Sequence, residues 1–177
     1  MLRRVISIND RAYAVQKIIN IHEAKNYCRE TLFTAVNIMD RYLVSVGHWN
    51  FPRLEMCLLA TTALFLAAKM EEHFAPSIEF TLHLLTEKEE ENIDKQAVFD
   101  LEAKVLVKLG FDLHFPGPVD PMHRFLHLLG YNKNDLIVNM TFQICKFTMN
   151  TPVFLNYRPS VIAACAIILS VNIHMHD

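Results

Sequence analysis

Glycine is scarce in this chain, with four among 177 residues, and no apolar run is long. The longest apolar stretches, near residues 58–68 and 161–171, fall short of the roughly 20 residues that a membrane-spanning helix needs. The net charge of −2 gives no electrostatic reason to expect a partner among nucleic acids or anionic membranes. No secretory signal opens the chain, because Met1-Leu2-Arg3-Arg4 is followed by a polar, alternating stretch. We therefore predict no nucleic-acid partner and no membrane partner.

Recognisable motifs for redox, metal or catalytic chemistry are also missing. The four cysteines lie in apolar helical stretches with no paired spacing: Cys28, Cys57, Cys145 and Cys165. We expect reduced core thiols in a nuclear or cytoplasmic protein rather than a disulfide framework. His123 and His127 have a spacing that can bind metal, but the glutamate of the usual motif is absent. Because no nucleophile motif or glycine-rich phosphate loop occurs, we predict no enzyme, no cofactor and no metal site.

The residues that are abundant favour helices. Hydrophobic residues make up 52% of the chain and charged residues 20%, so the chain can bury a sizeable core. The shortage of glycine and the absence of alternating β-branched runs favour an all-α fold. Apolar periodicity, capping residues and breakers together predict eight helices. Their approximate bounds are 9–21, 29–46, 52–69, 77–85, 94–109, 121–129, 135–149 and 159–174.

The segment Phe115-Pro116-Gly117-Pro118 marks a boundary between two lobes. Five predicted helices precede it and three follow, which fits a tandem repeat whose second copy stops early. We therefore predict two domains, residues 1–115 and 116–177. The helix over Val161–Ile173 is apolar all round, like the centre of a bundle, yet no predicted helix follows to cover it. A shortened form of a longer protein, a natural truncation and a partner on that face all stay open.

Lys69 ends a predicted helix that is apolar on nearly every face from Leu54 to Ala68. A helix without a polar face is usually the buried centre of a bundle. A lysine at its C-terminal end suits the helix dipole, and Glu71 and Glu72 follow at once. Lys69 is therefore either a solvated residue that closes the helix or a cation on the rim of the core, placed to bond something outside the chain.

Four ordered sequence blocks carry a family resemblance. They are Leu-Phe-Thr-Ala-Val-Asn-Ile-Met-Asp-Arg-Tyr-Leu at 32–43, Leu-Phe-Leu-Ala-Ala-Lys-Met-Glu-Glu at 64–72, Leu101-Glu102 through Gly110-Phe111-Asp112-Leu113, and Tyr-Arg-Pro-Ser-Val-Ile-Ala-Ala-Cys-Ala-Ile-Ile-Leu at 157–169. Together they resemble the cyclin box, most closely that of A- and B-type cyclins. The resemblance implies tandem cyclin-box helical bundles, the first complete and the second partial. It also implies a regulatory subunit that binds and activates a cyclin-dependent protein kinase in cell-cycle control, without a cofactor of its own.

Proteins with this fold also include general transcription factors and adaptors. The alternative is therefore an adaptor or scaffold of the cyclin fold that binds peptides or transcription machinery without activating a kinase. A nucleic-acid binder should show a basic face, and the charge balance argues against one. The presence of Lys69 and Glu102 argues against a scaffold that has lost its kinase.

Glu102 interrupts an apolar helical stripe, where a carboxylate is costly unless a partner pairs with it. Lys69 is the obvious partner, because its helix ends where the fifth predicted helix should pack. The cyclin resemblance implies that Lys69 and Glu102 bond the backbone of the kinase αC helix. It also implies apolar kinase contacts from four residues: Met70, Leu106, Phe111 and Leu113.

Arg11 and Asp40 lie among apolar residues of the first two predicted helices. The resemblance implies that they form a buried ion pair that locks these helices, and that Leu58 is the fifth box position, in the core. Many A- and B-type cyclins recruit substrates at an apolar patch on the first helix. Charged or small residues replace much of that patch here: Asp10, Tyr13, Ala14, Lys17 and Cys57. We therefore predict that the substrate-docking patch is degraded.

Overall fold

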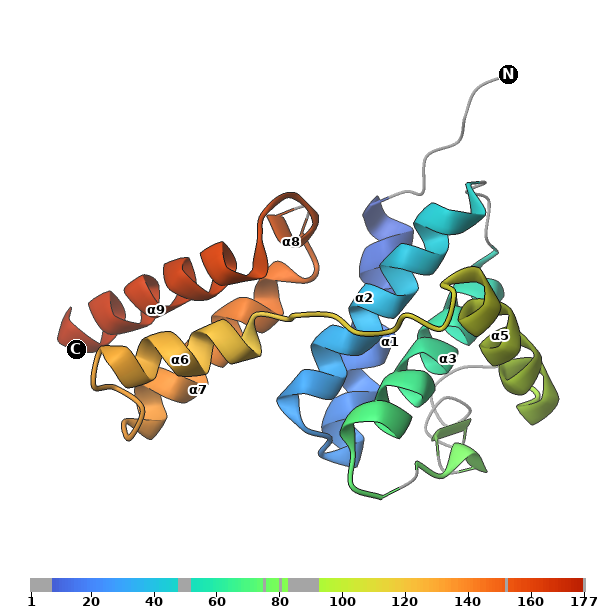
Figure 1. Ribbon diagram of the computed structural model, residues 1–177, viewed down its shortest axis with the longest axis horizontal. Helices are drawn as coiled ribbons and strands as arrows, with labels where there is room; N and C mark the ends of the chain where they lie inside the picture. The colour runs from blue at the N-terminus through green and yellow to red at the C-terminus, as the bar shows by residue number, and fades with distance from the viewer. Residues whose placement is uncertain are drawn as a thin grey trace. The chain divides into compact units, whose positions relative to one another are not determined.

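The structure is a computed structural model that describes residues 8–47, 52–74, 76–79, 81–82, 93–151 and 153–176. Within these ranges every regular element is a helix, so the predicted all-α fold is confirmed. The chain divides into two compact units, Met1–Phe115 and Pro116–Asp177, which are described one at a time below (Figure 1).

The first unit is built around one buried helix. Its helices are α1 (Ile8–Lys25), α2 (Arg29–Val46), α3 (Arg53–Glu71) and α5 (Lys95–Lys108). α3 packs against each of the other three (Figure 1), and nearly all of its residues from Met56 to Ala68 are buried. This agrees with the absence of a polar face on α3. Residues 78, 79, 81 and 82 are also helical, while the rest of the predicted helix over 77–85 lies outside the described residues.

The helix ends follow local chemistry closely. α5 ends in a Schellman motif: Gly110 has a φ of 62°, Phe111 N–H donates to the Leu106 carbonyl, and Gly110 N–H donates to the Val107 carbonyl. Pro52 stands one position earlier than predicted, at the N-cap of α3 rather than inside the helix. Such one-residue differences are usual at helix termini.

The second unit contains α6 (Val119–Leu128), α7 (Asp135–Thr148), α8 (Val153–Asn156) and α9 (Pro159–His176). α9 packs against α6 and α7. A buried hydrogen bond between the hydroxyls of Thr141 and Ser170, 2.6 Å long, fixes the register of α7 and α9. The other side of α9 exposes large apolar side chains, among them Ile168 and Leu169. The helix that is apolar all round is therefore covered on one side only.

The cysteines were predicted to be core thiols, and this is correct for two of them. Cys57 and Cys145 are buried, and burial raises the pKa of the Cys145 thiol to about 12. Cys28 is half-buried and precedes α2, and Cys165 is exposed because α9 is covered on one side only. All four are free thiols.

Two further findings concern the described residues only. None of the helices there combines the length and the apolar character that a membrane crossing requires. The same residues include no cluster of three or more histidine, cysteine or acidic side chains suited to a metal ion.

Candidate functional site

Lys69 and Glu102 form an ion pair between the last turn of α3 and the middle of α5. The distance from Lys69 Nζ to Glu102 Oε1 is 2.6 Å. The ammonium group also lies 4.3 Å from the ring centroid of Phe65, so it is held between a carboxylate and an aromatic face. The Lys69 side chain is 39% exposed and that of Glu102 is 14% exposed. A pair this accessible contributes only about 0–1 kcal/mol to folding, so stability alone does not explain its position.

The packing of α5 on α3 places Glu102 at this rim. Val98 and Val105 are fully buried, so the ridge they form on α5 faces the core. Glu102 follows Val98 by four residues and precedes Val105 by three, so it lies on the same stripe of α5, and its carboxylate reaches the Lys69 ammonium group at the rim. The rings of Phe65 and Phe99, 6.1 Å apart, close the contact between the two helices below the ion pair. A carboxylate that looked costly in the sequence is therefore paired and partly solvated.

Exposed apolar side chains occur near the ion pair in sequence. Met70 is 46% exposed and Phe111 is 70% exposed, and Leu106 lies half-buried one turn after Glu102 on α5. Leu113 differs, because it is buried and belongs to the packing of the first unit itself. Methionine and aromatic side chains are enriched at protein–protein interfaces, so exposed Met70 and Phe111 favour a protein-binding surface in this part of the first unit.

Two glutamates that the sequence did not assign to a role anchor the end of α3. Glu72 Oε1 accepts hydrogen bonds from the Cys28 backbone N–H at 2.8 Å and from the Thr31 hydroxyl at 2.5 Å. Glu71 accepts from the Thr34 hydroxyl at 2.9 Å. These bonds attach the C-terminal end of α3 to the first two turns of α2, whose N-cap residue makes no side-chain cap of its own. The segment that carries the site lysine is thereby held in place.

Arg11 and Asp40 form a bidentate ion pair between α1 and α2. Arg11 Nε and Nη2 donate to the two carboxylate oxygens, each at 2.8 Å. The side chains are only 10% and 12% exposed. Burial raises the pKa of the Asp40 carboxyl, and the guanidinium group acts in the opposite direction. Two parallel hydrogen bonds are the geometry that offsets the cost of burying such a pair.

The face of α1 that was compared with the substrate-docking patch of A- and B-type cyclins has little accessible apolar surface. Ala14 and Cys57 are buried. The guanidinium group of Arg53 lies 4.1 Å from the ring centroid of Tyr13, and the ammonium group of Lys17 lies 5.1 Å from it. The aromatic ring is therefore covered by cations. Asp10, at the start of α1, is exposed.

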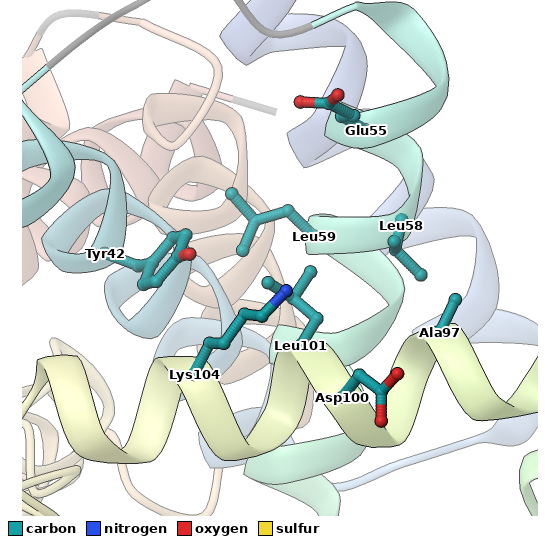
Figure 2. Close-up of a pocket in the computed structure, with 8 residues that line it drawn as sticks. All are labelled: Tyr42, Glu55, Leu58, Leu59, Ala97, Asp100, Leu101 and Lys104. Atoms are coloured by element: carbon teal, nitrogen blue, oxygen red, sulfur yellow. The ribbon is translucent and has the colours of Figure 1, made fainter.

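Leu58 was expected in the core, and the structure corrects this. It is half-buried and lines a groove of about 400 Å³ between α2, α3 and α5 (Figure 2). The reason is that the face of α3 carrying Leu58 meets a gap between α2 and α5 instead of a packed helix. Sequence reasoning also missed four other groove residues: Tyr42, Glu55, Asp100 and Lys104. Of these four, only Lys104 has a signal in the sequence, since it shares a stripe at helical spacing with Ala97 and Leu101.

Two domain models of one protein family match nearly the whole chain. The N-terminal cyclin domain matches residues 2–114, and the C-terminal cyclin domain matches residues 113–177. The chain therefore belongs to the cyclin family. Cyclins are regulatory proteins rather than enzymes.

The relatives include proteins named as mitotic cyclins. Mouse G2/mitotic-specific cyclin-B3 is 29% identical over 160 residues, which is 90% of this chain and 11% of the relative. Rice (Oryza sativa subsp. japonica) cyclin-B2-1 is 32% identical over 157 residues, which is 89% of this chain and 35% of the relative. Candida albicans G2/mitotic-specific cyclin CLB2 is 31% identical over 160 residues, which is 90% of this chain and 31% of the relative. The chain thus spans about a third or less of the length of these relatives.

A solved structure shares the fold. A viral cyclin from herpesvirus saimiri superimposes with a TM-score of 0.81 at 13% sequence identity. The match covers 95% of this chain and 71% of that chain.

Proposed function

We propose that this chain binds a cyclin-dependent protein kinase and switches it on, as a regulatory subunit in cell-cycle control. The observation that carries the proposal is the ion pair of Lys69 and Glu102 on the rim between α3 and α5. It supplies one cationic donor and one anionic acceptor side by side. Two exposed apolar side chains are close to the pair in sequence: Met70 follows Lys69 directly, and Phe111 comes just after the end of α5.

The pair fits the exposed backbone groups of a helix in the partner. Lys69 Nζ can donate to a backbone carbonyl, and Glu102 can accept from a backbone N–H. By the cyclin resemblance this partner helix is αC of the kinase, which the cyclin holds in its inward position. That position forms the lysine–glutamate ion pair of the kinase active site. The cyclin then acts by binding the active kinase conformer more tightly and shifting the population toward it.

The two units have different roles in this proposal. Residues 1–115 form the kinase-binding lobe, and residues 116–177 form a partial C-terminal cyclin fold. ATP, magnesium and phosphoryl transfer belong to the kinase, so the chain itself needs no cofactor. We place its action in the nucleus, the cytoplasm or both, where such kinases and reduced thiols occur.

Co-elution with purified kinases tests the proposal against the adaptor alternative. We expect a one-to-one complex with at least one cyclin-dependent kinase on size-exclusion chromatography, and kinase activity in the fraction that contains both proteins. A complex without activity would favour the scaffold. Failure to bind any kinase of a panel from the same organism would contradict the proposal and favour a peptide-binding adaptor.

Peptides with the pattern Arg-x-Leu are expected to bind weakly or not at all at the α1 face. Tyr13 lies beneath the cations Lys17 and Arg53, so an incoming arginine meets like charge and little apolar surface. Fluorescence anisotropy with a labelled Arg-x-Leu peptide measures this, and an A-type cyclin with an intact patch serves as the positive control. Tight binding of the peptide to the parent chain, with no further gain in the variant Lys17→Trp, would contradict the prediction.

A further inference from the structure

The first unit has a long groove beside α5 that the proposed function does not use. The hollow of about 400 Å³ between α2, α3 and α5 is continued by a second one of about 490 Å³ toward the C-terminal end of α5. Both hollows are lined by Tyr42 and Lys104, so they adjoin each other, and together they are called the α5 groove below.

The floor of the α5 groove is apolar and incompletely covered. Leu58 from α3 and Leu101 from α5 are half-buried beside the buried Leu59, and Figure 2 shows their side chains converging between the two helices. Val46 and Val107 line the continuation. Apolar surface of this kind gains free energy when a ligand removes it from water.

Acidic and basic side chains line different parts of the groove. Glu55 on α3 and Asp100 on α5 are exposed and flank the leucines (Figure 2). Lys104 crosses the middle, and Lys108 lines the far end. Tyr42 lines both hollows, and burial and the nearby carboxylate of Glu55 raise the pKa of its phenol, so the hydroxyl stays a neutral hydrogen-bond donor. Along α5 the groove changes from acidic through apolar to basic.

We propose that the α5 groove binds a peptide segment of a partner protein that carries one large apolar side chain, with lysine or arginine on one side and aspartate or glutamate on the other. The apolar side chain fits between Leu58 and Leu101. The cation of the peptide faces Glu55 and Asp100, and its carboxylate faces Lys104. Complementary charges on the two sides of the apolar side chain fix the direction of the peptide as well as its affinity.

This inference goes beyond the proposed function, because the groove and the kinase site occupy different stripes of α5. Ala97, Leu101 and Lys104 share one stripe of the helix, at i, i+4 and i+7. Glu102 and Leu106, at i and i+4, share another stripe. Because a helix has 3.6 residues per turn, Asp100 and Lys104 each lie nearly opposite Glu102 on α5. A kinase on one stripe leaves the other open, so the chain can hold a kinase and a peptide together.

Selection from a displayed library of random short peptides on the full chain tests the proposal. We expect enriched peptides to share an apolar residue flanked by opposite charges, and Kd is then measured by fluorescence anisotropy. Glu55→Lys and Lys104→Glu change exposed residues, so the fold is retained, and each should weaken the selected peptide about tenfold or more because like charges then face each other. The peptide with the matching charge reversed should regain affinity for its variant. Lys133→Glu, an exposed lysine in the second unit, is the matched control and should change nothing.

Three results would overturn the proposal. The first is a library without enrichment over an unselected pool. The second is selected peptides that bind Glu55→Lys and Lys104→Glu as tightly as the parent chain. The third is a concentration-dependent dimer that Lys104→Glu dissolves, since a second copy would then occupy the groove. Kinase activation by these variants should equal that of the parent, which separates failure here from failure of the proposed function.

Discussion

We expect Lys69→Ala and Glu102→Ala each to lower the affinity for the proposed kinase partner sharply, by about 2–5 kcal/mol, while the chain stays folded. In the proposed complex the kinase buries the ion pair, so the loss of one partner leaves the other desolvated against the kinase. In the free chain both side chains reach water, at 39% and 14% exposure, and the same loss costs folding about 1 kcal/mol or less. Surface plasmon resonance gives the affinities, and urea unfolding gives the stabilities of the same preparations.

Lys133→Ala controls for the removal of a surface lysine. It is exposed in the second unit, far in sequence from the ion pair, and should leave both affinity and stability unchanged. If Lys69→Ala and Glu102→Ala both keep the kinase affinity of the parent chain, the ion pair is not part of the interface. A matching loss in the control would indicate a general charge effect instead.

Arg11→Ala is expected to destabilise the chain itself, by about 3–5 kcal/mol, because it leaves the carboxylate of Asp40 buried without its partner. That side chain is 12% exposed and accepts two hydrogen bonds from Arg11 in the parent structure. The midpoint of urea unfolding, monitored by circular dichroism, measures the change in the free energy of unfolding.

The double variant Arg11→Met/Asp40→Leu is the control for this prediction. It removes both charges and keeps apolar volume, so it should recover most of the stability that Arg11→Ala loses. A double variant as unstable as the single one would show that shape, not the stranded charge, matters here. Equal losses of folded protein in Arg11→Ala, Lys69→Ala and Glu102→Ala would contradict the division between scaffold and binding residues.

The helices could be predicted because their signals are local. The α2 bounds follow from periodicity and from Gly47, which ends the helix with a φ of 69°. By contrast α8 has four residues, too few to show a period, and sequence analysis missed it. The exposure of Cys165 also escaped prediction, because it depends on which side of the uniformly apolar α9 is covered.

The site could be predicted in part for the same reason. Glu102 stood out because a charge in an apolar stripe is costly, and that argument needs only the sequence. The hydrogen bonds of Glu72 to the start of α2 join residues 41 and 44 positions apart in the sequence, and no local sequence pattern predicts them. The α5 groove is harder still to predict from the sequence, because it depends on how closely α2, α3 and α5 approach one another. Packing geometry decides whether a leucine such as Leu58 is core or groove.

Phosphorylation of histone by a cyclin-dependent kinase tests the central claim most directly. The kinase is assayed with the parent chain and with the Lys69→Ala/Glu102→Ala double variant. The proposed function predicts strong activation by the parent chain and little or none by the double variant at equal concentration of folded protein. Equal activation by both, or none by either in a kinase preparation that another cyclin activates, would contradict it.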